Sequence, residues 1–168
     1  MFFSRTGVTR RVAEALAHAV PADVEELREV RSRRGLLGYL RSGFEATTRR
    51  ASSELLPVQR DPRNYDLVLI GGPTWGAALS SPVRAYLEGQ RQKLPDTGLF
   101  VTCAGREADT VLAQMSALLS KPPLATLTLR DVDVKRSPAV QVGEFLEQAL
   151  VAWEKRGAAP PANPRAVG

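Results

Sequence analysis

Hydrophobic residues occur along this chain in two patterns. Continuous apolar runs occupy residues 65–70 and 98–103, and such runs are typical of strands buried on both faces of a parallel sheet. Elsewhere apolar residues recur at four-residue spacing, as Val12, Leu16 and Val20 do, which indicates a helix with one buried face. Because the two patterns alternate, the sequence predicts an α/β protein built of successive strands and helices.

The expected elements follow from these patterns and from the prolines and glycines between them. The alternation predicts a parallel sheet with helices on both faces. We expect one domain over residues 1–156 and a disordered tail over 157–168, which is rich in proline, alanine and glycine. The predicted elements are a strand end at 1–3, a helix over 9–19, a strand over 22–27, a helical apolar face within 35–48, a loop over 52–64, a strand over 65–70, a helix over 81–90, a strand over 98–103, a helix over 110–120, a strand over 125–129 and a helix over 140–155.

Composition narrows the class of protein. The chain has 168 residues, of which 43% are hydrophobic, enough for one full-sized core. The sequence has neither a signal peptide pattern nor an apolar run of membrane-spanning length, so we expect a cytoplasmic protein. Cys103 is the single cysteine, which excludes an internal disulfide. His18 is the single histidine and is expected to face solvent, so no metal site is predicted.

Positive charge is concentrated in one segment. The whole chain carries a formal charge of +5, and Arg28 to Arg50 contains seven arginines against Glu29 and Glu45, which equals the entire excess. Such a segment is either a solvated insertion or a patch that contacts an acidic partner or an anionic membrane surface. No nucleic-acid-binding motif accompanies the arginines, so nucleic acid is not an expected partner.

Three loops follow predicted strands at the edge where an open parallel sheet collects ligands, at residues 4–9, 71–81 and 104–109. The first two are rich in small and hydroxyl residues and contain no acid or histidine, and the third contains a glycine. A phosphoacceptor receiver domain would need acids where the second loop has glycine and proline. A cysteine phosphatase would need its cysteine at the start of a phosphate loop, and Cys103 is more typical of a buried strand end.

The first loop has the composition of a phosphate cradle. Ser4, Thr6 and Thr9 supply hydroxyl groups around Gly7, which permits close backbone approach or a positive φ. The loop leads into a helix, and unpaired N–H groups at a helix N-terminus favour an anion. In the alternative interpretation, Thr6 or Thr9 only caps the helix.

The motif Ser4-x-Thr6-Gly7-x-Thr9 resembles the phosphate loop of flavodoxins, which bind flavin mononucleotide (FMN). Residues 65–89 are similar to the third strand, flavin loop and third helix of that family, with Gly-x-Pro-Thr-Trp at the centre. In this loop Trp75 offers an aromatic face for a flat ring, whereas its alternative role is that of a partly buried packing residue. The glycines of the loop leave room for the backbone to approach a ligand.

The resemblance covers about residues 1–155 and implies a flavodoxin-like three-layer sandwich. Its five-stranded parallel sheet would have the order 2-1-3-4-5, with helices on both faces. FMN would then be the cofactor, and the protein would transfer electrons or reduce a quinone-like or protein acceptor. The cofactor-binding residues that the resemblance implies are Ser4, Arg5, Thr6, Gly7, Val8, Thr9, Pro73, Thr74, Trp75, Gly76, Cys103, Ala104 and Gly105.

Some features depart from the family pattern. The third loop has no aromatic residue, whereas flavodoxins usually place a second aromatic there, so one face of the ring would be more exposed. A second copy of the chain in a homodimer, or a substrate, could cover that face. Arg106 would favour an anionic reduced ring, unless it is only a solvated loop residue. The basic segment is also unusual, because electron-carrier flavodoxins are usually acidic.

The first strand looks truncated, because only Met1 to Phe3 precede the phosphate-type loop. A strand normally has about 5–6 residues, so we expect roughly four to eight further apolar residues encoded upstream of Met1. The truncated strand, the third loop and the basic segment also leave a second function open. In it, the chain is a flavodoxin-fold scaffold that has lost FMN and acts as an interaction module.

Overall fold

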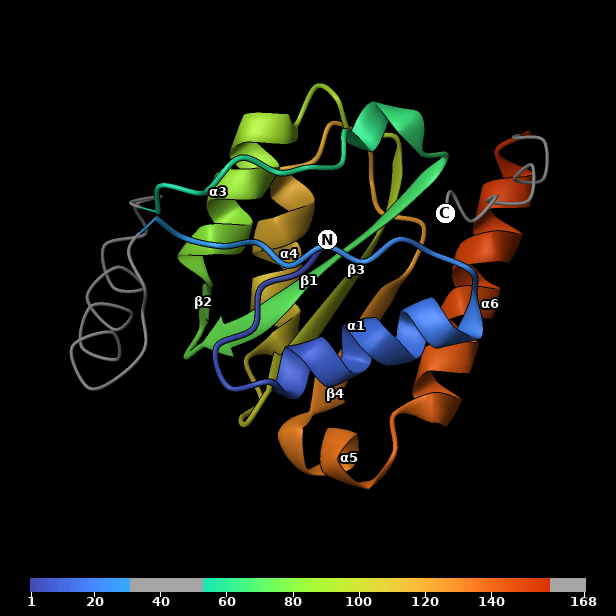
Figure 1. The fold of residues 1–168 in the computed structure, drawn as a ribbon. Coiled ribbons are helices and arrows are strands. Elements are labelled where there is room, and N and C mark those ends of the chain that lie inside the picture. Colours follow the sequence, from blue (N-terminus) through green and yellow to red (C-terminus); the bar gives the residue numbers. More distant parts are fainter. Residues whose placement is uncertain (31–52, 158–168) are drawn as a thin grey trace.

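The computed structural model describes residues 1–30 and 53–157, and Figure 1 shows strands and helices that alternate along the chain. The helical face predicted within 35–48 and all but the first residue of the predicted tail lie outside the described residues. The elements are α1 (Val8–Ala19), the 3-10 helix η1 (Pro62–Asn64), β1 (Leu67–Trp75), β2 (Ala78–Leu79), α3 (Ser81–Gln90), β3 (Asp96–Cys103), α4 (Ala108–Ala117), β4 (Thr126–Arg130), α5 (Asp131–Arg136) and α6 (Ala139–Lys155).

Four strands form one sheet in the order β2-β1-β3-β4. Strands β1 and β3 are parallel, with a register that runs from Leu67 opposite Asp96 to Pro73 opposite Thr102. Strand β4 is parallel to β3, whereas the short β2 is antiparallel to β1 and forms a hairpin with it. The predicted α/β architecture is therefore confirmed, with parallel pairing among the three longer strands.

The predicted five-strand order 2-1-3-4-5 is not confirmed. Phe2 forms isolated parallel bridges to Glu26 on one side and to Gly71 of β1 on the other, and no regular strand forms at 1–3 or over 22–27. The amide of Phe2 donates to the carbonyl of Glu25, and the amide of Phe3 donates to the carbonyl of Gly71, each at 3.1 Å. The segments expected as the first two strands therefore meet through isolated bridges only. The antiparallel β2 was not predicted, because two residues have no detectable period.

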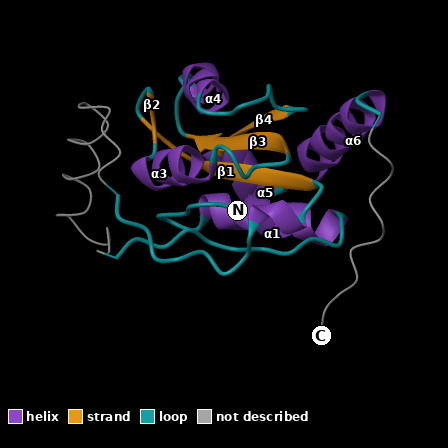
Figure 2. Cartoon of the chain, turned by 90° about the horizontal axis from the view of Figure 1, so that it is seen from above, coloured by secondary structure: helices purple, strands orange, loops and turns teal. Residues whose placement is uncertain are grey.

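The sheet lies between two layers of helices (Figure 2), and each face carries its own core. On the face covered by α3 and α4, Ile70 and Val101 pack against Val83 and Val111. On the face covered by α1, α5 and α6, a second cluster surrounds Phe100. The prediction of helices on both faces is therefore confirmed, and Tyr86 on α3 and Trp153 on α6 are both buried.

The largest differences from the sequence prediction are the end of one strand and one additional helix. Strand β1 continues through Gly71, Gly72 and Pro73 to Trp75, although the glycines and proline predicted that it ends at residue 70. The pairing of these residues with β3 outweighs their low strand propensity. Helix α5 was not predicted, because its six residues are too short for a periodic signal and only Val134 among them is buried.

Gly71 is required by packing. A Cβ atom at Gly71 would lie 2.2 Å from Cε2 of Phe100, so the Phe100 ring occupies the place of a side chain. Gly72 is similarly closed by Val83, 2.6 Å from an added Cβ. These two glycines therefore serve the core, and the prediction that they leave room for a ligand is wrong.

We predict that Gly71→Ala lowers the free energy of unfolding by about 1–3 kcal/mol, because the added methyl group overpacks a core that is already filled. The matched control is Gly143→Ala on α6, where an added Cβ meets nothing within 4 Å. That control should be neutral or stabilising by about 0.5–1 kcal/mol, since alanine favours a helix. Urea denaturation of the two variants measures both; equal effects would contradict the packing role of Gly71.

The α-ammonium group of Met1 is buried beside β1, where it donates a hydrogen bond to the carbonyl of Leu69 at 2.9 Å. Burial lowers the pKa of this group from 8.0 to about 6, partly offset by the negative charge of Glu25. The folded chain therefore binds fewer protons than the unfolded chain between these two values.

We predict that the free energy of unfolding of the 168-residue chain rises by about 2 kcal/mol between pH 6 and pH 8. The stabilisation is complete above the unfolded pKa of the amine and is lost as the pH falls through the folded one. Histidine titrates in the same range, so the measurement is made by urea denaturation in the His18→Gln variant, which removes the single histidine. A flat profile in that variant would contradict the buried amine.

Candidate functional site

The three loops singled out in the sequence gather at one end of the sheet (Figure 1). Residues 4–7 connect Phe3 to α1, residues 76–80 continue β1 into β2 and α3, and residues 104–107 connect β3 to α4. Because β1 and β3 are parallel and in register, their carboxyl ends lie side by side. The predicted site residues therefore lie at one edge, which is where ligands bind in open α/β sheets.

Ser4 organises the first loop. Its Oγ accepts hydrogen bonds from the amides of Gly7 at 3.1 Å and of Arg10 at 3.3 Å. Gly7 precedes α1 with φ +91°, a left-handed conformation that residues with a side chain rarely adopt. The expected alternative of a threonine cap is wrong, because the first turn of the helix is bound by Ser4.

Thr9 faces the sheet. Its hydroxyl lies 2.8 Å from the hydroxyl of Thr102 on β3, and both side chains are buried. This position corrects the prediction that Thr9 offers a hydroxyl to a phosphate, because its hydroxyl is committed to the core. Thr102 was missed in the sequence, although a hydroxyl within the apolar run of β3 was the available signal.

The groups of the first loop that are not used in internal contacts fit an anion. No residue in the described part of the chain accepts from the amides of Val8 and Thr9 at the start of α1. A Cβ atom placed on Gly7 would meet nothing within 4 Å, so the space in front of the loop is open. Arg5 and Thr6 are exposed beside it. A phosphate group fits this combination of helix N-terminus, hydroxyl and guanidinium.

Trp75 ends β1 and lies half-buried against the first strand segment. Its ring meets that of Phe3 edge to face, with centroids 6.0 Å apart and an interplanar angle of 85°. The chain then reverses through Gly76 and Ala77, and Gly76 has φ +59°, which suits the first position of a two-residue hairpin turn. Thr74 pairs with Leu79 across this hairpin.

The third loop contributes exposed backbone rather than an aromatic ring. Cys103 is buried at the end of β3, as expected from its apolar character, and burial raises the pKa of its thiol, with the negative charge of Asp131 adding to the shift. Ala104 and Gly105 are exposed, and a Cβ on Gly105 would lie 2.4 Å from a carboxylate oxygen of Glu107. The side chain of Cys103 is therefore buried, whereas Arg106 is exposed like Ala104 and Gly105.

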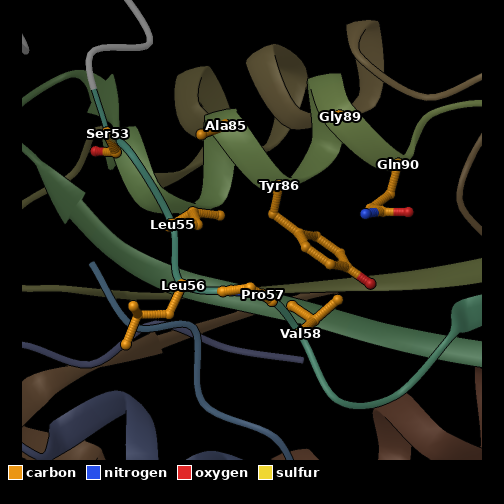
Figure 3. Close-up of a pocket in the computed structure, with 9 residues that line it drawn as sticks. All are labelled: Ser53, Leu55, Leu56, Pro57, Val58, Ala85, Tyr86, Gly89 and Gln90. Carbon is orange, nitrogen blue, oxygen red and sulfur yellow. The ribbon is translucent and has the colours of Figure 1, made fainter. Parts of the chain in front are cut away.

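A cavity of about 260 Å³ lies elsewhere, between residues 53–58 and α3 (Figure 3). Leu55, Pro57 and Val58 line one side, and Tyr86 extends across it from the helix. Burial raises the pKa of the Tyr86 phenol. None of the three loops lines this cavity, so the cavity is a feature separate from the loop edge.

Residues 1–30 and 53–157 contain neither a candidate metal-binding cluster nor a candidate membrane-spanning helix. These residues contain no cluster of three or more histidine, cysteine or acidic side chains that could hold a metal ion. No helix within them is both long and apolar enough to cross a membrane.

The buried Thr9–Thr102 contact generates a stability prediction. We expect Thr9→Val and Thr102→Val each to lower the free energy of unfolding by about 1–3 kcal/mol, because each leaves one buried hydroxyl without its partner. The double variant should lie within about 1 kcal/mol of the original protein, since it removes both hydroxyls and preserves their shape. Urea denaturation of all four proteins gives the coupling; additive losses in the double variant would show that the two hydroxyls do not bond.

Comparison with known proteins identifies the fold. A scan against protein-family models finds no match, and a search of curated proteins finds none either. Among solved structures, a flavoprotein from Lactobacillus acidophilus NCFM, crystallised in complex with FMN, matches with a TM-score of 0.68. The two are 17% identical, and the match covers 86% of this chain and 95% of that one.

Two further solved structures, provisionally described as flavoproteins, match the fold of this chain to a similar degree. The one from Bacteroides eggerthii DSM 20697 has a TM-score of 0.65 and 20% identity, over 83% of this chain and 93% of that one. The one from Bacteroides uniformis ATCC 8492 has a TM-score of 0.67 and 16% identity, over 87% and 94%. The chain therefore has the α/β fold of these flavoprotein structures, which confirms at the level of fold the resemblance seen in its loops.

Proposed function

We propose that this chain binds FMN at the loop edge of its sheet and acts in electron transfer or in the flavin-dependent reduction of a quinone-like or protein acceptor. The observation that carries the proposal is the first loop, where Gly7 with φ +91° precedes two amides of α1 that no described residue accepts from, beside the exposed Thr6. The Lactobacillus acidophilus flavoprotein, which shares this fold, was crystallised in complex with FMN.

Each loop would contribute a different interaction. The amides of Val8 and Thr9, with Thr6 and Arg5, would bind the phosphate group. Trp75, whose ring meets that of Phe3 at an interplanar angle of 85°, would cover one side of the ring system. The exposed Gly76, Ala104 and Gly105, together with the half-buried Pro73 and Thr74, would supply backbone hydrogen bonds to the ring edge.

FMN supplies one- and two-electron redox chemistry when bound, and the protein positions and tunes it. In the third loop, residues 104–107 contain no aromatic side chain, and all four residues are exposed. Such a surface would admit a flat quinone-like acceptor, the docking face of a protein or a second copy of the chain. Arg106 would place a positive charge beside this surface. The arginine-rich segment that begins at Arg28 would attract an acidic partner or an anionic membrane surface.

The second candidate function, a scaffold without FMN, is favoured by the half-buried packing of Trp75 on Phe3 and by the absence of the loops from the cavity in Figure 3. In that case the fold would act through its surfaces. Flavin titration of the purified protein distinguishes the two functions.

We predict that FMN added to the protein gives a bound flavin absorbance near ~450 nm and that riboflavin, which lacks the phosphate, binds more weakly. Thr6→Ala should weaken FMN binding by about tenfold, because one charge-assisted hydrogen bond to phosphate is lost, and should leave riboflavin binding unchanged. Trp75→Ala should weaken both ligands, since both contain the ring.

The matched control is Thr126→Ala. Thr126 is also exposed, but it begins β4 and therefore lies at the opposite end of the sheet from the loops. It should change neither affinity. If the original protein binds neither flavin, the flavoprotein proposal is wrong and the scaffold function remains. Equal loss of FMN and riboflavin binding in Thr6→Ala would mean that the first loop does not hold the phosphate.

A further inference from the structure

The segment that carries Trp75 has little support of its own. Residues 74–79, here called the Trp75 hairpin, contain two paired positions, Thr74 with Leu79 and Trp75 with Ala78. Two paired positions make a marginal hairpin in water. Strand β2 is also the edge of the sheet, so its outer amide and carbonyl groups have no strand beside them.

Gln114 on α4 forms hydrogen bonds with backbone groups on this outer side of the hairpin. Its Nε2 donates to the carbonyl oxygen of Ala77 at 2.8 Å, and its Oε1 accepts from the amide of Leu79 at 3.0 Å. These are the two backbone groups that flank Ala78. A residue on a parallel neighbouring strand would bind the same pair of groups, so the primary amide of Gln114 substitutes for the missing strand.

The two hydrogen bonds of Gln114 lie next to the residue that pairs with Trp75. Ala78, between the two bonded residues, is the residue that pairs with Trp75. Gln114 is itself held, because its Oε1 also lies 3.3 Å from Nη2 of Arg84 on α3. Arg84 is largely buried and lies 3.9 Å from a carboxylate oxygen of Glu88, which restricts its guanidinium.

Helix α4 begins at Ala108, directly after the third loop. A side chain of α4 therefore joins the hairpin of the second loop to the helix that follows the third. We infer that Gln114 is a positioning residue, which sets the place of Trp75 relative to the third loop and thereby the affinity and stacking of a flavin ring. This inference rests on the proposed FMN binding, although the anchoring of the hairpin does not.

The test uses Gln114→Met, which keeps the length and bulk of the side chain and removes both its donor and its acceptor. Hydrogen exchange of the FMN-free protein comes first. The Leu79 amide should exchange at least about tenfold faster in the variant, because its acceptor is lost. Gln148→Met is the matched control, since Gln148 is exposed on α6, and it should leave the Trp75 hairpin unchanged.

FMN titration of the same three proteins is the second measurement. Gln114→Met should bind FMN about tenfold more weakly than the original protein, and its bound flavin should be less quenched, because the indole is less well placed against the ring. Quenching of bound flavin is a readout that a general loss of stability does not change.

Three results would overturn the inference. Unchanged exchange at Leu79 would show that Gln114 does not anchor the hairpin. Faster exchange with unchanged FMN affinity and quenching would reduce Gln114 to a structural residue. Failure of the original protein to bind FMN would refute the proposed function and the positioning role with it, while the exchange experiment would still report on the anchoring.

Discussion

The parallel pairing of β1 with β3 is the constraint on which the rest of the structure depends. Seven consecutive residue pairs join the two strands, and the Phe100 ring lies where Gly71 would otherwise carry a side chain. This register brings the carboxyl ends of both strands to the same edge, so the loops that follow them must meet there. It also separates two cores, because successive residues of each strand point to opposite faces.

The loops at this edge are connected to one another by side-chain contacts. Thr9, at the start of α1, bonds to Thr102 near the end of β3. Phe3, before the first loop, packs against Trp75 at the end of β1. Gln114 bonds the turn after Trp75 to the helix that follows the third loop. A ligand at this edge would therefore meet a surface whose parts are held in fixed relation, which reduces the ordering that binding requires.

The three hydroxyl residues of the first loop have different structural roles. Three of them looked equivalent in the sequence, yet Ser4 binds backbone amides, Thr9 is buried against β3 and only Thr6 remains exposed. The small residues divide in the same way, since Gly71 and Gly72 serve packing whereas Gly7 and Gly76 serve the backbone conformation. Two of these four glycines therefore bear on the site through their positive φ.

The sequence by itself determined the alternation of strands and helices, the ends of α3 and the location of the three loops, because apolar periodicity and proline positions are local properties. From the composition of the first loop, the sequence also predicted an anion cradle there. Only the tertiary structure decided that β1 continues through two glycines and a proline, that Thr9 turns inward, and that Gln114 binds the Trp75 hairpin. These features depend on partners that are distant in the chain, such as Phe100, Thr102 and Ala77, and no local pattern encodes a contact between residues that only folding brings together.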